Sequence, residues 1–257
     1  MQPKPLPYPL RTILDLVFPP RCQGCGRFGP EVLCGACRQA IRRIVPPFCL
    51  RCGVPFDPLA QGGPLCAACR RRRRFPYTWS RSAAVYGGVL REAVHNYKFA
   101  RRRVLAWPLA ELMLEAIAAW QKAGLPDSDP AQWDLLCPVP LHPRRLRARG
   151  FNQSLLLCHR LSQALGVPVT EPLRRVRETL PQQQLPGEAR PENVREAFAA
   201  ETAAVAGRRV VLVDDLWTTG STLVQCARAL RGARAVYLFS LSRPLLGATP
   251  ALSLPAR

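Results

Sequence analysis

The segment that decides the fold is VVLVDDLWTTGST, residues 210–222. It begins with Val210–Val213, a run of β-branched and apolar residues that is typical of a strand buried inside a parallel sheet. Two acids follow, then a turn that combines glycine with hydroxyl residues, and a helix is predicted over Thr222–Leu230. Such a strand, turn and helix place the turn at the carboxyl edge of the sheet, where open α/β sheets bind their ligands.

The turn has the composition of a site for a phosphorylated sugar. Its backbone N–H groups, with the dipole of the helix behind them, predict a cradle for one phosphate group. Four hydroxyl residues add donors, and the glycine lets the backbone approach the phosphate closely. The residues expected in this cradle are Thr218, Thr219, Gly220, Ser221 and Thr222. Asp214 and Asp215 are placed to accept hydrogen bonds from vicinal sugar hydroxyls, so the segment predicts a site for ribose 5-phosphate.

Other interpretations of this segment are weaker. The chain has neither G-x-x-x-x-G-K-[ST] nor G-x-G-x-x-G, the motifs of the common nucleotide-binding loops. The plainest alternative is a solvent-exposed pair of acids followed by a helix-capping threonine. Capping needs one hydroxyl, however, and not four beside two acids.

The second part of the chain alternates predicted strands with predicted helices. Strands are expected over residues 82–86, 134–139, 210–213 and 235–241. Helices are expected near residues 90–98, 105–119, 153–165 and 222–230, with an arginine-rich loop between 139 and 153 and a polar loop over 172–191. This alternation predicts an α/β fold with a mostly parallel sheet and helices on both faces.

Eight of the 11 cysteines lie between residues 22 and 69, in four C-x-x-C pairs. Each pair directs two thiolates to one point, and two pairs supply the four ligands of a tetrahedral zinc ion. The ligands expected for two structural zinc sites are Cys22, Cys25, Cys34, Cys37, Cys49, Cys52, Cys66 and Cys69. Sequential pairing of neighbouring C-x-x-C turns is the simplest arrangement, and an interleaved pairing is the alternative.

Redox or iron chemistry fits this cluster less well. The four pairs lack the βαβ frame of a thioredoxin-type dithiol, and no Cys-Pro run or longer spacing indicates an iron–sulfur centre. The chain shows no secretory signal, so the thiols are expected in the reducing cytoplasm, where clustered cysteines bind metal rather than form disulfides. A module this small is expected to fold only when its metal binds.

Composition divides the chain in two. Residues 1–81 hold 14 cations and three acids, whereas residues 82–257 hold 23 and 14. We expect a double zinc-ribbon module over residues 12–75, a second domain over 82–243 and a loose tail over 244–257. The formal net charge of +20 favours polyanionic partners such as nucleic acids and phosphorylated metabolites. The sequence has no run of about 18 apolar residues, so no membrane span is expected.

A run of five arginines is followed at once by aromatic residues. The residues expected to contact single-stranded DNA are Arg70, Arg71, Arg72, Arg73, Arg74, Tyr77 and Trp79. Cations that meet a phosphate backbone, next to aromatic rings that stack on bases, are typical of single-strand binding. The alternative is a solvated linker whose aromatic side chains dock the two domains together.

Several motifs together resemble a known family. Residues 210–222 resemble the phosphoribosyl pyrophosphate (PRPP) motif of type I phosphoribosyltransferases nearly residue for residue, and the whole chain resembles the ComF family, in which a zinc module precedes such a domain. The supporting motifs are PVPLH at 138–142 with Arg144 and Arg145, RGFNQ at 149–153, R-x-T-x-x-Q-x-x-L at 177–185 and R-x-x-N-x-x-x-A-F at 190–198. The resemblance covers residues 12–243 and implies a type I phosphoribosyltransferase-like fold, with a distant likeness to the amidophosphoribosyltransferase of purine synthesis.

The resemblance also implies roles for individual residues. Asp214 and Asp215 would hold the 2- and 3-hydroxyls of the ribose, and residues 218–222 its 5-phosphate, with Mg²⁺ accompanying PRPP. The loop with Val139 and Pro140 would approach the pyrophosphate. The residues implied for the leaving group and for a lid that excludes water are Arg149, Arg177, Thr179, Gln182 and Arg190.

For ComF-like chains the resemblance implies a role in natural transformation. Incoming single-stranded DNA would be handled on the cytoplasmic side, in partnership with a competence helicase. The alternative is an active phosphoribosyltransferase of nucleotide or purine salvage, which transfers ribose 5-phosphate from PRPP to an amine or a base. The intact 214–222 motif predicts PRPP binding in either case.

Overall fold

The computed structural model describes residues 19–56, 63–72, 74–176 and 197–245. Its main sheet has four parallel strands in the order β1-β6-β5-β2. In that order their bounds are Trp79–Val85, Ala235–Arg243, Arg209–Leu216 and Leu135–Pro138. The apolar run 210–213 lies in β5, an inner strand, and all four of its residues are buried. The predicted parallel α/β fold is confirmed.

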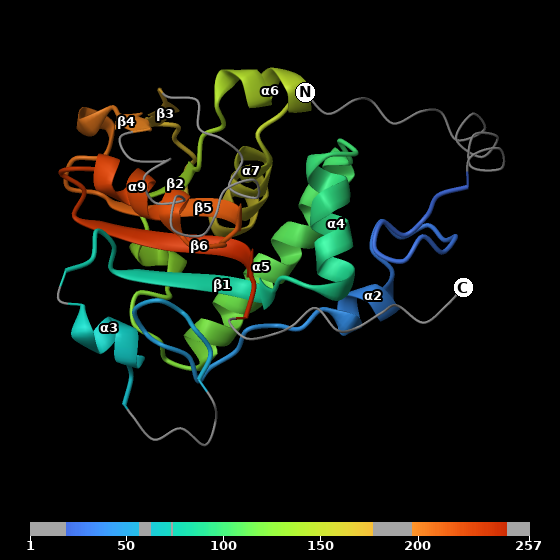
Figure 1. Cartoon of the computed structure of the whole chain (residues 1–257), viewed down its shortest axis with the longest axis horizontal. Helices are drawn as coiled ribbons and strands as arrows, with labels where there is room; N and C mark the ends of the chain where they lie inside the picture. Colours follow the sequence, from blue (N-terminus) through green and yellow to red (C-terminus); the bar gives the residue numbers. More distant parts are fainter. Residues whose placement is uncertain (1–18, 57–62, 73, 177–196, 246–257) are drawn as a thin grey trace.

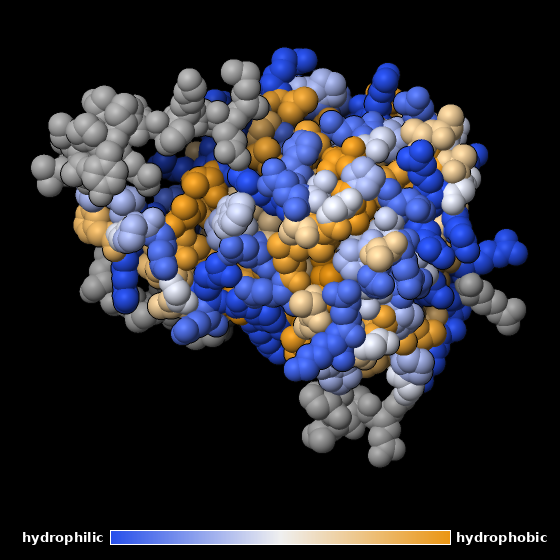
Figure 2. Space-filling view, turned by 180° about the vertical axis from the view of Figure 1, so that it is seen from behind, coloured by the Kyte–Doolittle hydropathy of each residue, from blue (hydrophilic) through white to orange (hydrophobic). Residues whose placement is uncertain are grey.

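Helices pack on both faces of this sheet (Figure 1). One face is covered by α5 (Ala106–Lys122) and α7 (Gln153–Leu165), with α4 (Gly88–Lys98) beside them in the same core. The other face is covered by α9 (Ser221–Ala229) and by a small antiparallel pair. The remaining elements are α2 (Gly35–Ala40), α3 (Ala67–Arg71), α6 (Pro143–Arg149), β3 (Leu173–Arg175) and β4 (Phe198–Ala200), with 3-10 turns at Arg103–Leu105, Pro130–Gln132 and Thr202–Ala204. Figure 2 shows the molecule from behind, with hydrophobic residues gathered near the middle and hydrophilic ones around them.

Two segments differ from the sequence prediction. The arginine-rich stretch expected as a loop forms α6, because Pro143 stands at its first position and the Nδ1 atom of His142 accepts a hydrogen bond from the Arg144 amide, 3.3 Å away. Gly150 ends the helix in the left-handed region at φ 80°. The segment expected as one polar loop contributes β3 at its start, which pairs with β4.

The inner face of β1 carries an aromatic cluster with a charge inside it. The Trp79 ring stacks on Tyr237 at 4.9 Å between ring centroids and meets Trp120 edge-on at 6.0 Å. Arg81 is only 1% exposed, its guanidinium lies 4.4 Å from the Trp79 ring, and its Nη2 donates to the carbonyl of Pro126 at 2.9 Å. Burial lowers the pKa of Arg81 to about 10, so the group stays charged at neutral pH.

The cysteine-rich module runs along β1, which is an edge strand of the sheet. The amide of Ile44 donates to the carbonyl of Ala83 at 2.9 Å, and the amide of Ser80 donates to the carbonyl of Arg51 at 2.8 Å. In Figure 1, α2 and α3 lie toward opposite ends of β1. The module therefore covers a strand edge that would otherwise expose unpaired backbone groups.

Candidate functional site

The eight clustered cysteines form two groups of four. The first ribbon contains Cys22, Cys25, Cys34 and Cys37, and the second ribbon contains Cys49, Cys52, Cys66 and Cys69. Within each group all four sulfur atoms lie within 4.8 Å of one another. The pairing of C-x-x-C turns is therefore sequential, and the interleaved alternative is wrong.

The sulfur atoms have the spacing that a tetrahedral zinc ion requires. The Sγ atoms of Cys25 and Cys34 are 3.9 Å apart, and those of Cys52 and Cys66 are 3.7 Å apart. Four sulfurs placed about 2.3 Å from a central zinc ion lie about 3.8 Å from one another. Both groups therefore fit zinc.

Backbone amides donate to one of the two buried cysteines of each group. In the first ribbon the amide of Cys34 donates to the Cys22 sulfur at 3.3 Å, and in the second the amide of Cys66 donates to the Cys49 sulfur at 3.3 Å. Hydrogen bonds from the Cys52 side chain and from the backbone amides of Cys52, Cys66 and Arg51 lower the pKa of Cys49 to about 4. The Cys49 thiol is therefore deprotonated at neutral pH, whereas burial raises the pKa of Cys37 and Cys69, so those thiols would lose their protons on binding zinc.

The predicted phosphate cradle lies between β5 and α9. Gly220 has φ 75° and precedes the first turn of α9, so its backbone takes the left-handed conformation that glycine adopts without strain. A Cβ at this position would overlap the indole ring of Trp217, which packs directly on the glycine. The hydroxyls of Thr219 and Ser221 lie 2.8 Å apart, at the start of the helix. The backbone amides and hydroxyls of the turn thus gather at one helix N-terminus.

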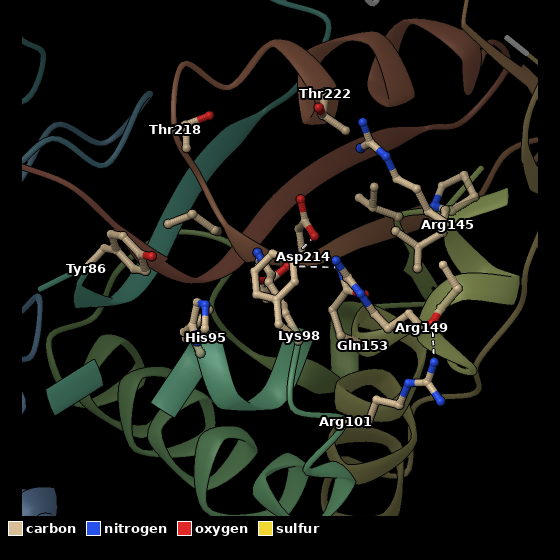
Figure 3. A pocket seen from close by; sticks show the side chains of 18 of the residues that line it. Tyr86, His95, Lys98, Arg101, Arg145, Arg149, Gln153, Asp214, Thr218 and Thr222 are labelled. Atoms are coloured by element: carbon tan, nitrogen blue, oxygen red, sulfur yellow. Dashed lines mark hydrogen bonds and ion pairs between the residues drawn. The ribbon is translucent and has the colours of Figure 1, made fainter. Parts of the chain in front are cut away.

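The two aspartates at the end of β5 are buried and held by side chains of other elements. Ser154 donates from its hydroxyl to Asp214 at 2.9 Å, and Gln153 donates from Nε2 to Asp215 at 3.2 Å. Lys98, from α4, forms an ion pair with Asp215 (Figure 3). Burial, together with the Asp215 carboxylate, raises the pKa of Asp214 from its ordinary 3.8 to about 7.

Asp214, Asp215, Lys98 and Gln153 line a cleft of about 990 Å³. Figure 3 shows Thr218 and Thr222 on one side of Asp214, and Lys98, Arg149 and Gln153 close to it on the other. The Nη1 atom of Arg149 lies 2.5 Å from the Oε1 atom of Gln153, which fixes the guanidinium beside the aspartates. Further residues that line the cleft are Val139, Pro140, Leu141, Arg145, His95 and Arg101.

The structure adds partners that the sequence prediction did not place in the site. Lys98, Gln153 and Ser154 hold the two aspartates, although they come from α4 and α7. The RGFNQ motif contains Gln153 and was therefore the one sequence signal for this residue. Its neighbour Asn152 helps to position it. Asn152 caps α7 by accepting from the Ser154 amide at 3.0 Å and also donates to the carbonyl of Val139 at 3.1 Å.

One part of the predicted DNA site is wrong. Tyr77 is 7% exposed and Trp79 is 1% exposed, because each ring is buried in one of the two hydrophobic cores that pack on the sheet. The Trp79 ring contacts Trp120, Trp133 and Tyr237 of the second domain, and neither buried ring is available for stacking on a base. Arg70, Arg71, Arg72 and Arg74 are exposed.

Five predicted site residues lie outside the part of the chain that the structure describes. They are Arg73, Arg177, Thr179, Gln182 and Arg190. The predicted tail is described only as far as residue 245.

Comparison with known proteins agrees with this arrangement. Residues 13–70 match the model of the double zinc ribbon domain, and residues 152–237 match that of the phosphoribosyl transferase domain. The DNA utilization protein YhgH of Salmonella typhi is 37% identical over 219 residues, which cover 83% of this chain and 91% of that protein. The chain belongs to the ComF family.

Other members of the ComF family carry names that refer to competence. Competence protein F of Haemophilus influenzae is 29% identical over 232 residues, covering 86% of this chain and 95% of that protein. Competence protein ComFC of Bacillus subtilis is 28% identical over 221 residues, covering 83% of this chain and 85% of that protein. Among the described residues of this ComF-family chain, no helix has the length and apolar character that crossing a membrane requires.

Proposed function

We propose that this chain binds PRPP with Mg²⁺ in the cleft of Asp214 and Asp215, and that it handles incoming single-stranded DNA in the cytoplasm during natural transformation, together with a competence helicase. The lining of the cleft supports the proposal that the chain binds PRPP. Thr218 and Thr222 from the two ends of the predicted cradle, two carboxylates and a set of cations line this one cleft. PRPP has a 5-phosphate, two vicinal hydroxyls and a pyrophosphate, which match these three features in turn.

Different residues of the cleft bind different parts of PRPP. Residues 218–222 bind the 5-phosphate through backbone N–H groups at the start of α9. Asp214 and Asp215 accept hydrogen bonds from the ribose hydroxyls. Arg145 and Arg149 line the same cleft and bind the pyrophosphate. Burial and the neighbouring Asp215 carboxylate raise the pKa of Asp214, so a cation bound beside it would favour its ionised form. Bound Mg²⁺ would supply neutralisation of the pyrophosphate charge.

The DNA part rests on the names of the relatives and on charge. Several relatives are named for competence or DNA utilization, and a net charge of +20 attracts any polyanion. With Tyr77 and Trp79 buried, the rings available for stacking lie elsewhere. Phe99, which also lines the cleft, is 58% exposed, and Trp107, which does not line it, is 56% exposed.

These two rings stand among arginines. The guanidinium of Arg149 lies 5.5 Å from the Phe99 ring, and that of Arg160 lies 4.9 Å from the Trp107 ring. Residues 101–103, three further arginines, lie exposed between the two aromatics in the sequence. Exposed rings interleaved with cations are typical of surfaces that bind single strands.

The test of the PRPP site is calorimetric titration of the full chain with PRPP in the presence of Mg²⁺. We expect saturable binding in the parent. Asp214→Asn should weaken it at least about tenfold, because a charged hydrogen-bond acceptor for the ribose is lost. Asp129→Asn is the matched control, since Asp129 caps a turn outside the cleft and asparagine caps equally well. A parent that does not bind PRPP, or equal affinities in the two variants, would contradict the proposed site.

The pH dependence of PRPP affinity provides a second check. The pKa of Asp214 is about 7, so the carboxylate form that accepts the ribose hydroxyls and faces a cation is fully populated only above that pH. Affinity should therefore fall as the pH is lowered from about 8 to about 6, because protons compete with the ligand. The PRPP affinity that remains in Asp214→Asn should depend less on pH, because the titrating carboxyl group is absent.

The DNA surface is tested with a labelled single strand and fluorescence anisotropy. Phe99→Ala and Trp107→Ala should each weaken binding by about 1–3 kcal/mol per lost stack, without changing the dependence on salt. Phe28→Ala is the matched control, because Phe28 is 62% exposed with Arg21 over its ring at 4.1 Å, but lies in the first ribbon. Equal losses in all three variants would show non-specific binding to any cationic surface.

A further inference from the structure

Trp217 is a structural support of the phosphate loop. It is 8% exposed, and its amide donates to the carbonyl of Ser242 at 2.8 Å, which ties the loop to the end of β6. Its indole ring packs so closely on Gly220 that a Cβ there would overlap three ring atoms. Because packed atoms at this distance transmit displacement, the position of the indole determines the position of the Gly220 backbone.

Arg243 joins this tryptophan to the second ribbon. It is the last residue of β6 and is 6% exposed. Its guanidinium lies 5.7 Å from the Trp217 ring centroid, and its Nη1 atom donates to the carbonyl of Cys52 at 2.6 Å. An unbroken set of contacts therefore runs from a cysteine of the second ribbon, through Arg243 and Trp217, to Gly220.

The ribbon end of this connection is itself held firmly. Gly53, the residue after Cys52, has φ 67°, and a Cβ there would overlap the carbonyl oxygen of Ser80. With zinc bound, the four thiolates and the Zn²⁺ ion would carry a net charge of about −2, which would attract the nearby guanidinium of Arg243. The backbone of Cys52 is thus a fixed point for the arginine.

We propose that the second ribbon positions the phosphate loop, and that Arg243 and Trp217 are the positioning residues. This inference rests on the proposed function, in which residues 218–222 bind the 5-phosphate of PRPP. Among the residues that the structure describes, no comparable set of contacts joins the first ribbon to Trp217. Its ion pairs, from Arg38 and Arg43 to Glu111 and Glu115, lead to α5, and Asn96 of α4 donates to the carbonyl of Gln23 at 2.9 Å.

The experiment compares Arg243→Met with Arg38→Met in the zinc-loaded full chain. Both changes remove one guanidinium that ties a ribbon to the second domain, and both keep a long apolar side chain. Three quantities are measured: zinc per chain, hydrogen exchange of the 217–222 amides without ligand, and the dissociation constant for PRPP with Mg²⁺. Arg243→Met should retain about two zinc ions, exchange faster in the loop, and bind PRPP about tenfold more weakly, a change of about 1.4 kcal/mol. Arg38→Met should match the parent in loop exchange and in PRPP affinity.

The readouts separate the possible failures. Equal loop exchange and equal affinity in the two variants would overturn the proposal. If the parent does not bind PRPP, the proposed function fails, while loop exchange still tests the support. If Arg243→Met does not fold by circular dichroism, Trp217→Phe replaces it, because the smaller ring leaves a gap against Gly220. Trp217→Phe should then show the same faster loop exchange, and parent-like exchange would again overturn the proposal.

Discussion

The two ribbons offer the same set of four thiolates, but they are attached to the rest of the chain by different forces. The first ribbon reaches α5 through ion pairs of Arg38 and Arg43 with glutamates whose side chains are 31% and 40% exposed. The second ribbon reaches the sheet through hydrogen bonds to backbone carbonyls. Arg51 donates to the carbonyl of Thr78 at 2.6 Å, and Arg243 donates to that of Cys52. Identical metal ligands therefore do not imply identical attachments. Surface ion pairs help to hold the first ribbon, in addition to the bond from Asn96 to the Gln23 carbonyl, whereas the side-chain donors that hold the second ribbon meet backbone carbonyls.

The largest expected effect comes from removing one ligand of each ribbon. Cys49 is fully buried and Cys25 is exposed. Cys49→Ser should lower the free energy of unfolding by more than about 4 kcal/mol, because the ribbon that supports β1 and β6 loses its metal. Cys25→Ser should lower it by less. Thermal unfolding and zinc analysis measure the two effects, and equal losses of stability would break the comparison.

A matched pair of glycines gives the next largest difference. Gly26 and Gly53 each follow the second cysteine of a C-x-x-C turn, at φ 74° and φ 67°. Gly26→Ala should lower the free energy of unfolding by about 1–2 kcal/mol, which is the strain of an alanine in the left-handed conformation. No further cost is expected, because the added Cβ would meet no described atom beyond its chain neighbours within 4 Å. Gly53→Ala adds an overlap with a backbone carbonyl, so we expect a total of about 2–5 kcal/mol. Urea unfolding measures both, and similar values would show that the second ribbon yields as easily as the first.

The backbone ties of the second ribbon should be insensitive to salt. The Arg51 guanidinium donates to two carbonyls, those of Tyr77 and Thr78. Arg51→Met should therefore cost about 1.5–3 kcal/mol, as for hydrogen bonds made by a charged group. Carbonyl acceptors carry no net charge, so the loss should be the same in dilute and concentrated sodium chloride. A loss that disappears at high salt would contradict this account.

The smallest effect is expected at the surface ion pairs of the first ribbon. The Glu115 carboxylate accepts from Arg38 and from Arg43, each at 2.9 Å. Glu115→Gln should cost no more than about 1 kcal/mol, because both partners are partly solvated. At about 1 M salt, where screening acts within about 3 Å, the difference from the parent should vanish. Persistence of the loss at high salt would mean that packing, and not charge, fastens this ribbon.

Much of the fold could be predicted because its signals are local. An unbroken apolar run such as Val210–Val213 has one stable place, inside a parallel sheet, and four C-x-x-C turns have few uses other than metal. The cradle at 218–222 could be predicted for the same reason, since all its groups come from one turn and the start of one helix.

The parts of the fold and of the site that the sequence does not predict depend on contacts between distant segments. Trp79 follows a run of arginines, and that local sequence is the same whether the ring faces solvent or the core; only its stack on Tyr237 decides. Lys98 and Gln153 reach Asp215 from two different helices, and no spacing in the sequence predicts that meeting. The helix at 143–149 was predicted as a loop because four arginines in seven residues outweighed the cap signal of His142 and Pro143.

The buried charge of Arg81 has a consequence for how the chain finds its fold. Its guanidinium is sheltered only where the Trp79 and Trp120 rings and the Pro126 carbonyl come together. A shift of β1 by one residue against β6 would turn Arg81 to the opposite face of the sheet and leave an ion in apolar surroundings. We expect this penalty to reject wrong strand registers during folding. Arg81→Met should then keep most of the native stability but give a lower yield of correctly folded chain on refolding, because competing registers no longer bury a charge.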